Sequence, residues 1–193
     1  MPTEPNFDVE ETLRKAGETF WTNGYEATSM SDLLTAMGIQ KGSFYNTYGS
    51  KKDVYLKALE QYANARFADF SNRVAGQGPK QALTSLLQIV ADECLSRNGH
   101  KGCMVINCAL ELAHEDTAAQ RSVQRSFDTH EQAYADLITA GQAAGELDAS
   151  LDASATAKAM LAIVIGMRVM SRSGAPGASI RTLKDQALQL LEP

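Results

Sequence analysis

Residues 28–52, TSMSDLLTAMGIQKGSFYNTYGSKK, constrain the fold more than any other stretch of the chain. Ser29 and Asp32 have the spacing of a helix capping box, and apolar residues then recur at helical spacing. Gly38 stands where a helix can end in a left-handed turn. A second short helix is predicted over residues 41–48. The stretch therefore predicts two short helices joined by a tight turn, a helix-turn-helix.

The second of these helices has two different faces. Phe44 and Tyr48 are four residues apart and share one side. The opposite side carries small or polar residues, namely Gly42, Ser43 and Asn46, with Tyr45 on the flank. Residues 38–52 contain three lysines and no acid, although the whole chain has a net charge of −5. This local positive charge indicates a surface that meets phosphates. An ordinary hairpin with a solvated face is the alternative.

Residues 16–56 resemble the DNA-binding domain of the TetR (tetracycline-repressor-like) family of bacterial transcriptional regulators. The resemblance lies in F-x3-G-Y-x-A-T-S-M, then G-I-x-K-G-S-F-Y, then Y-x-S-K-x-D-V-Y. Two residues depart from the family pattern. Gln40 stands where Ser or Thr is frequent, and Tyr48 stands where Phe is usual, so its hydroxyl needs a partner or water if buried.

The resemblance implies an all-α fold. Residues 1–52 would form a three-helix DNA-binding domain, and residues 53–193 a helical domain for effector binding and dimerisation. On the outward face, Ser43 and Asn46 are candidates for base edges, because Asn can pair with adenine through two hydrogen bonds. Gly42 lets the backbone approach the duplex. Phosphate contacts, which fix register, are expected from Thr28, Lys41, Tyr45 and Lys51.

The rest of the chain shows helical periodicity and no strand-like alternation. Residues 1–7 are expected to form a short disordered arm. A helix capped by Asp8 should run to about Asn23, and a long one from Lys51 to about Arg73. A Gly- and Pro-containing break at 75–79 follows. Further helices are predicted near residues 80–97, 103–114, 117–144, 153–172 and 179–191, which makes about nine helices.

The composition supports a folded protein of the cytoplasm. Hydrophobic residues make up 44% of the 193 residues, enough to bury a core. The first residues lack the basic-then-apolar character of a signal peptide. Three cysteines indicate no disulfide framework.

The predicted helix over 153–172 carries only two charges between residues 155 and 170, Lys158 and Arg168. A membrane span is the alternative, but the uninterrupted apolar run is nine residues long, and a span needs about 20. The last helix has one apolar stripe, formed by Ile180, Leu183, Ala187 and Leu190. Two such helices from each subunit would form a four-helix bundle.

We therefore expect a homodimer through residues 153–191, an interface that the TetR resemblance also implies. A purely intramolecular core is the alternative. A two-fold dimer places two reading helices about 34–36 Å apart, so the expected partner is a double-stranded, pseudo-palindromic DNA operator.

Residues 99–116, GHKGCMVINCALELAHED, are the second informative stretch. Cys103 is predicted at a helix N-terminus near Lys101, which favours a reactive thiolate. Cys108 lies five residues further along, too far round a helix for a disulfide with Cys103. The pattern G-C-x-V-x-N-x-A-x-E resembles a TetR branch that includes repressors responding to electrophiles or oxidants. Cys103 is therefore a candidate sensor, with a packing or pocket-lining role as the alternative. Cys108 is a second candidate effector or redox residue.

A noncovalent effector is the other possibility for regulation. Its predicted contacts in the C-terminal helices are Met104, Phe127, Met167 and Arg168. Arg168 would meet either a ligand or a neighbouring Glu. The Cys and His spacings match no structural zinc pattern, and no phosphate loop or nucleophile motif is present. We therefore expect no metal, no cofactor and no catalysis.

Together these features predict a dimeric repressor that an effector or thiol modification releases from DNA. The TetR resemblance, together with the length of the helix over 51–73, implies that the effector would tilt this helix, which begins beside the reading helix. An activator of the same fold would share every motif. A helical thiol-dependent enzyme is a further alternative, and it would show no salt-dependent binding to a palindrome.

Overall fold

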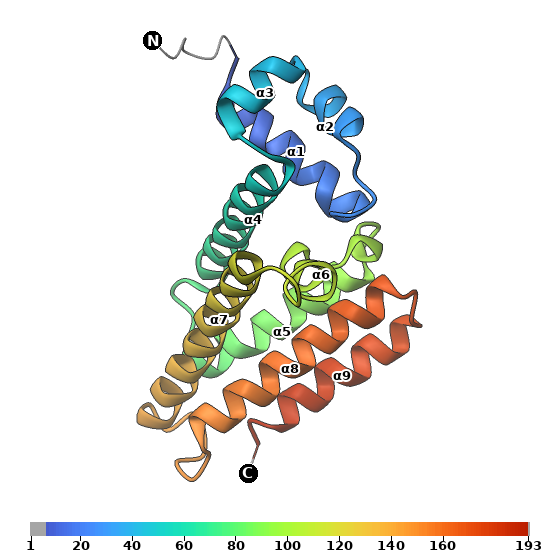
Figure 1. Ribbon diagram of the computed structural model, residues 1–193. Coiled ribbons are helices and arrows are strands. Elements are labelled where there is room, and N and C mark those ends of the chain that lie inside the picture. The colour runs from blue at the N-terminus through green and yellow to red at the C-terminus, as the bar shows by residue number, and fades with distance from the viewer. Residues whose placement is uncertain (1–6, 193) are drawn as a thin grey trace. The chain divides into compact units, whose positions relative to one another are not determined.

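The computed structural model of the protein describes residues 7–192. Within this range the chain forms nine α-helices and one short 3-10 helix, with no β-strand, which confirms the predicted all-α fold (Figure 1). The α-helices are α1 (Val9–Asn23), α2 (Met30–Met37), α3 (Lys41–Tyr48), α4 (Lys51–Val74), α5 (Pro79–Leu95), α6 (Met104–Glu111), α7 (Thr117–Ala143), α8 (Ala153–Arg172) and α9 (Gly177–Gln189). The 3-10 helix η1 (Gly99–Lys101) lies between α5 and α6 in sequence. Apart from Phe7, the predicted N-terminal arm lies outside the described residues.

The predicted capping residues set the first helix ends. The Asp8 carboxylate accepts the backbone N–H of Glu11 at 3.0 Å. Ser29 and Asp32 form a reciprocal capping box, with distances of 3.1 and 2.9 Å. Gly38 closes α2 in the left-handed conformation, with φ 69°. The short α2 and the tight turn before α3 follow directly from these residues.

The chain divides into two compact units. Unit 1 consists of Met1–Ala65 and Cys103–Val123, and unit 2 consists of Arg66–Gly102 and Gln124–Pro193. Helix α6 and the start of α7 therefore belong to the same unit as the helix-turn-helix. The long helices α4 and α7 each contribute residues to both units.

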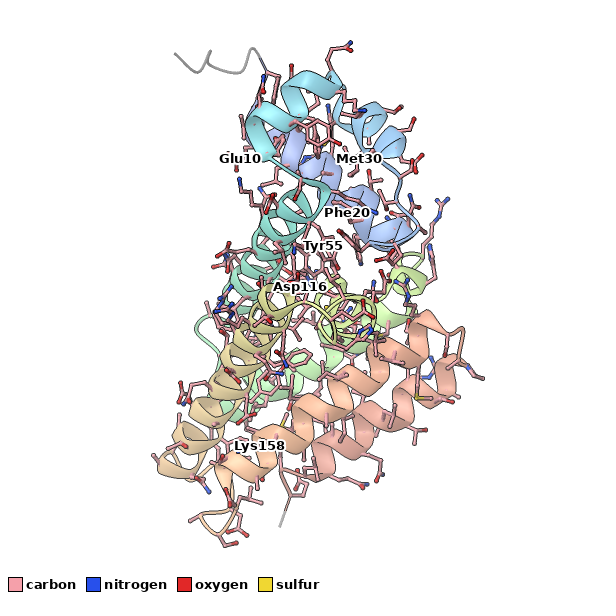
Figure 2. All side chains as sticks on the ribbon, in the orientation of Figure 1. Glu10, Phe20, Met30, Tyr55, Asp116 and Lys158 are labelled. Atoms are coloured by element: carbon pink, nitrogen blue, oxygen red, sulfur yellow. The ribbon has the colours of Figure 1, made fainter. Side chains whose placement is uncertain are left out.

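Aromatic side chains form much of the core of unit 1. The rings of Phe20 and Tyr55, both labelled in Figure 2, meet edge to face with centroids 4.9 Å apart. Phe44 and Tyr48 of α3 lie 5.7 Å apart and are both buried. Leu33 of α2 is fully buried as well. This core holds the helix-turn-helix with one face of α3 inward.

The core of unit 2 is built on α5, α8 and α9, which contact one another, and Figure 1 shows α8 and α9 side by side. Its fully buried side chains include Leu83, Leu87, Ile138, Met160 and Met167. Helix α8 has 20 residues and a mean hydropathy of 1.4, so by length and composition it could cross a membrane, a test that core helices also pass. Only 28% of this apolar stretch is buried within the chain.

Candidate functional site

Helix α3 presents the predicted polar face to solvent. Phe44 and Tyr48 point into the core and are 0% and 4% exposed. Lys41, Gly42, Tyr45 and Asn46 are exposed, and Ser43 is half-buried. The predicted division into two faces is confirmed. Since α3 carries no acidic side chain, its outward face offers hydrogen-bond donors and acceptors without opposing negative charge.

Gln40 occupies the cap position of α3 and forms no side-chain hydrogen bond with the helix backbone. The first turn of α3 therefore keeps backbone N–H groups that its own cap does not use. Such N–H groups favour a phosphate oxygen.

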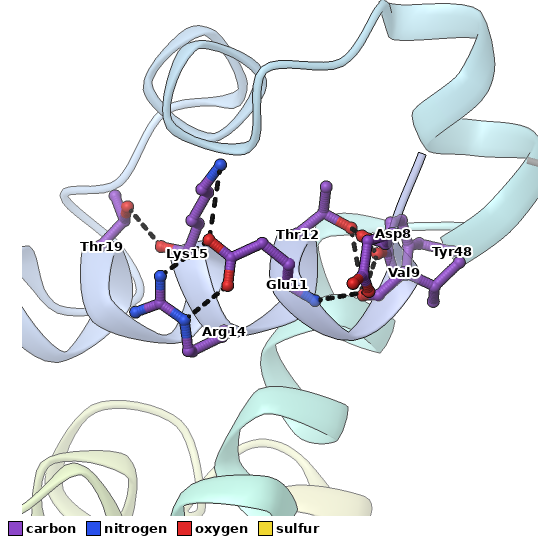
Figure 3. Close-up of polar contacts among 8 residues, drawn as sticks. All are labelled: Asp8, Val9, Glu11, Thr12, Arg14, Lys15, Thr19 and Tyr48. Carbon is purple, nitrogen blue, oxygen red and sulfur yellow. Dashed lines mark hydrogen bonds and ion pairs between the residues drawn. The ribbon is translucent and has the colours of Figure 1, made fainter. Parts of the chain in front are cut away.

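Tyr48 ties α3 to the first turn of α1. Its hydroxyl donates to the carbonyl of Val9 at 3.0 Å and is hydrogen bonded to the hydroxyl of Thr12 (Figure 3). Thr12 is 4% exposed and also lies 2.9 Å from the carbonyl of Asp8. Burial raises the pKa of Tyr48, so the hydroxyl stays protonated. The partner that the sequence required for Tyr48 is thus the first turn of α1.

Two of the three lysines near α3 are held in different ways. Lys51, the first residue of α4, places its Nζ 4.4 Å from the ring centroid of Tyr25. This cation–π contact orients the side chain while keeping its charge. Lys52 instead forms an ion pair with Asp116, with 2.7 Å between Nζ and Oδ2. Its charge is therefore compensated, and the positive excess predicted for this segment is smaller than the lysine count implies.

Thr28, which we predicted to contact phosphate, does not reach the surface. Its side chain is 0% exposed, and its hydroxyl donates to the carbonyl of Gly24 at 2.6 Å. The prediction is wrong because a side chain with no exposed surface offers no hydroxyl to DNA. Thr28 instead stabilises the turn between α1 and α2.

Helix α6 and the turn after it contact the turn between α1 and α2 and the first half of α4 within unit 1. The carboxylate of Glu111 accepts the backbone N–H of Tyr25 at 2.7 Å. The thiol of Cys108 is hydrogen bonded to the hydroxyl of Tyr55. Sequence reasoning missed both Glu111 and Asp116. Glu111 is the last residue of the G-C-x-V-x-N-x-A-x-E pattern, and Asp116 precedes α7 at a capping position, but neither signal reveals a distant partner.

The two cysteines proposed for redox sensing have different environments. Cys103 is the N-cap of α6 and is partly exposed. Cys108 is fully buried, and burial raises the pKa of its thiol to about 11. Cys108 therefore stays a thiol at neutral pH, which contradicts its proposed part in thiolate chemistry. Cys94, Cys103 and Cys108 are all free cysteines.

The residues predicted to contact an effector are divided between the two units. Met104 belongs to unit 1, whereas Phe127, Met167 and Arg168 belong to unit 2. Met104 and Met167 are 1% and 0% exposed, so both are core residues. Phe127 is partly buried against the core of unit 2.

Arg168 binds a neighbouring Glu, one of the two partners that the sequence predicted for it. Its Nη2 and the Nη2 of Arg66 both donate to the same oxygen of Glu93. Burial favours the protonated acid, but the hydrogen bonds and charges of the two arginines outweigh it and lower the pKa of Glu93. Glu93 and Arg66 were not predicted, because nothing in the sequence indicates that α4, α5 and α8 bring these three side chains together.

The charges of the Arg66–Glu93–Arg168 cluster influence the pKa of His130. Burial lowers the pKa of His130, and the charges of Arg168 and Arg66 lower it further. The ring is edge-on to Phe67 at 5.4 Å and to Tyr134 at 6.4 Å. Among residues 7–192, no three His, Cys, Asp or Glu side chains gather as a metal site would require.

Comparison with known proteins identifies two matching regions. Residues 13–58 match the bacterial regulatory proteins of the tetR family, and residues 79–184 match the tetracyclin repressor-like C-terminal domain. The first region contains the helix-turn-helix, and the second runs from the start of α5 into α9.

Individual proteins agree with this result. The chain is 32% identical to the uncharacterised HTH-type transcriptional regulator YezE of Bacillus subtilis (strain 168). The similarity extends over 149 residues, which is 77% of each protein. It is 25% identical to the HTH-type transcriptional repressor ComR of Escherichia coli (strain K12), over 95% of this chain and 89% of that one.

Among solved structures, a cysteine mutant of the TetR family transcriptional regulator CifR, complexed with 26-bp double-strand operator DNA, has the same fold. The TM-score is 0.84 at 24% identity, over 97% of this chain and 98% of the other. These matches confirm that the protein is a regulator rather than an enzyme. The chain belongs to the TetR family of bacterial transcriptional regulators, whose DNA-binding element here is the helix-turn-helix of α2 and α3.

Proposed function

We propose that this protein is a repressor that binds a pseudo-palindromic double-stranded operator as a homodimer and leaves it in response to an effector. The outward face of α3 carries the proposal, since it exposes polar groups beside Lys41 and Lys51 and holds no acidic side chain. The similarity to the repressor ComR and to CifR, whose structure was solved with operator DNA, supports the same function. An activator remains the alternative, which the position of the operator relative to the promoter would distinguish.

In this proposal the residues of α3 divide between base and phosphate contacts. Ser43 and Asn46 read base edges. Gly42 allows close approach of the backbone, and nothing within 4 Å would meet a Cβ there. Lys41, Tyr45 and Lys51 contact phosphates. Tyr45 is 44% exposed, so its side chain is open to solvent on this face.

The proposed dimer uses the exposed face of α8. This face includes a row of uncharged residues, most of them small, that are exposed or partly exposed at alternating spacings of four and three: Ala155, Ala159, Ala162, Gly166 and Val169. The exposed Lys158 lies at its edge. Val169 is 39% exposed, and a Cβ at Gly166 would meet nothing within 4 Å. Small residues at this spacing let two helices approach closely. The partner helix would cover the apolar surface of α8 that the chain itself leaves open.

Helix α9 contributes less to this surface than its sequence stripe predicted. Ile180 and Ala187 are 1% and 0% exposed and belong to the core of unit 2. Leu183 and Leu190 remain partly exposed. We therefore propose that α9 contributes through Leu183 and Leu190 only, beside α8.

Two routes of release are proposed. In one, a small molecule binds in the C-terminal helices near Phe127 and Arg168. In the other, an electrophile modifies Cys103, which is partly exposed at the start of α6. The structure of CifR was solved with cysteine mutants, which supports attention to thiols in this fold. Either event requires the released state to bind the effector more tightly than the DNA-bound state does. The expected compartment is the cytoplasm.

The test is a fluorescence anisotropy titration with the DNA upstream of the protein's own gene. Wild type should bind one site with high affinity, and binding should weaken steeply with salt. Asn46→Ala should lose about 1–3 kcal/mol of preference for the site over a scrambled duplex. Lys51→Ala should weaken both duplexes equally and lower the salt dependence. An Asn46→Ala protein with unchanged preference would refute the assignment of base reading to this residue.

A further inference from the structure

Within the function proposed above, we infer that Glu111, the last residue of α6, is a positioning residue for DNA binding. Its carboxylate holds the turn between α1 and α2, and this turn sets where the helix-turn-helix begins. Glu111 touches no DNA in this account. It acts through the backbone of Gly24 and Tyr25.

The carboxylate lies directly against this turn. Oε2 of Glu111 accepts the backbone N–H of Tyr25 at 2.7 Å. A Cβ built on Gly24 would lie 2.8 Å from Oε1 and 3.0 Å from Oε2. Gly24 also has φ 88°, a conformation that residues with side chains rarely adopt. Glycine at position 24 therefore leaves room for the carboxylate, and its backbone conformation is one that disfavours other residues.

Hydrogen bonds connect the turn between α1 and α2 to Thr28, which lies just before α2. The buried hydroxyl of Thr28 donates to the carbonyl of Gly24 at 2.6 Å, and the N–H of Thr28 donates to the carbonyl of Tyr25 at 3.3 Å. Ser29, the next residue, caps α2. A displacement of Gly24 and Tyr25 would thus reach the first residue of the helix-turn-helix through a chain of short contacts.

Tyr25 also connects the turn to a proposed phosphate contact. Its ring lies 4.8 Å from that of Tyr55 and under the Nζ of Lys51 at 4.4 Å. The hydrogen bond that the backbone N–H of Tyr25 donates to the Glu111 carboxylate fixes Tyr25 at the base of this stack. Losing it would release both the entry to α2 and the orientation of Lys51.

A second contact holds the other end of the same segment. Asp116, which follows α6 and is labelled in Figure 2, pairs with Lys52 at 2.7 Å. The other oxygen of Asp116 accepts the N–H groups of Ala118 and Ala119, each at 2.9 Å, and so caps α7. The segment from Glu111 to Asp116 is therefore attached on both sides of the helix-turn-helix, to the turn before α2 at Tyr25 and to the first turn of α4 at Lys52.

This arrangement gives a route for regulation that differs from a tilt of α4. Cys103 caps the start of α6, and Glu111 ends it, within the same compact unit as the helix-turn-helix. Helix α6 is eight residues long and largely buried. Cys103 and Glu111 thus lie at the two ends of the same helix, so this helix connects the candidate sensor to the contact with Tyr25.

The experiment compares Glu111→Ala with Glu115→Ala in operator binding. Both substitutions remove one negative charge from the same segment, and the side chain of Glu115 is 78% exposed. A purely electrostatic effect would strengthen DNA binding in both variants, since less negative charge repels phosphates less. Positioning predicts the opposite sign for Glu111→Ala alone, with affinity about tenfold weaker. Hydrogen exchange at the Tyr25 amide should also be faster in Glu111→Ala and unchanged in Glu115→Ala.

Each outcome is decisive. If Glu111→Ala binds the operator as wild type does, or more tightly, the inference fails even if the Tyr25 amide exchanges faster. If Glu111→Ala does not fold, Glu111→Gln keeps the shape and an acceptor oxygen, and it should show a smaller loss of affinity in the same direction. If the wild-type protein binds no palindrome, the proposed function fails, and the inference fails with it.

Discussion

The hydroxyl of Tyr48 in α3 is hydrogen bonded to the hydroxyl of Thr12 in α1, and both side chains are buried. This pair fixes the C-terminal end of α3 to the first turn of α1. The resemblance to the TetR family marks Tyr48 as a departure from the usual Phe, so the pair is a feature of this chain that its own Thr12 makes possible.

Tyr48→Phe should therefore lower the free energy of unfolding by about 0.5–1.5 kcal/mol, since it leaves Thr12 with one partner fewer. The double variant Tyr48→Phe/Thr12→Val should recover part of this loss, because neither polar group then remains buried. Urea denaturation measures both. Tyr45→Phe, at the exposed ring of the same helix, should leave stability unchanged, and an equal loss there would contradict the explanation.

Glu93 accepts hydrogen bonds from both Arg66 and Arg168. Removing its carboxylate should therefore lower the free energy of unfolding. Glu93→Gln leaves two partly buried guanidinium groups without their carboxylate, and we expect a loss of about 1–3 kcal/mol in unfolding free energy. The matched variant is Glu131→Gln, whose partner Lys158 has a side chain that is 62% exposed. That pair should contribute less than about 1 kcal/mol. Equal effects in urea denaturation would show that the Glu93 cluster is no stronger than a surface ion pair.

The pH dependence of stability should report on His130. Burial holds its pKa below the ordinary value of 6.5, so the folded state resists protonation while the unfolded chain accepts it. Unfolding free energy should therefore fall as the pH drops below about 6.5, down to the lower pKa of the folded state. His130→Gln should flatten this part of the profile. The control is His114→Gln, whose side chain is 59% exposed and should leave the slope intact.

A substitution on the exposed face of α8 tests the proposed dimer interface. Ala162→Glu places a charge in the middle of its exposed small-residue face, so it should convert a dimer to a monomer in sedimentation velocity. Operator affinity should fall with it, because a monomer binds only one half-site. Thr139→Glu, at an exposed position of α7, should leave the dimer intact. A dimer that persists in Ala162→Glu would place the interface elsewhere.

The sequence predicts this fold well where local chemistry decides it. Ser29, Asp32 and Gly38 set the helix-turn-helix through contacts only a few residues long, and the structure shows each of them as expected. The facing of α3 follows from the spacing of Phe44 and Tyr48 alone. Capping and periodicity are properties of the nearby chain, so the sequence carries them directly.

Long-range pairs were not predictable in the same way. Glu111 and Tyr25 are 86 positions apart, and Arg168 and Glu93 are 75 apart. Sequence periodicity places each residue on its helix, but only the packing of helices brings the two together. Thr28 failed for the same reason, because its burial depends on the turn between α1 and α2 rather than on its neighbours in sequence.

Cys103 should be the cysteine that reacts first. It is partly exposed at the start of α6, whereas Cys94 and Cys108 are buried, and a buried thiol with a raised pKa supplies little thiolate. Brief treatment of the folded protein with N-ethylmaleimide, followed by peptide mass spectrometry, should find the label on Cys103. Denatured protein, in which all three are accessible, is the control for peptide recovery.

Modification at Cys103 should also release DNA if this residue is the sensor. Band-shift titration with N-ethylmaleimide or a quinone should free the operator from wild type and leave Cys103→Ser bound. Release from both proteins would assign the effect to another group. Labelling of Cys103 with full retention of the operator would make this thiol accessible but structural, and the search would then move to reversible ligands near Phe127 and Arg168.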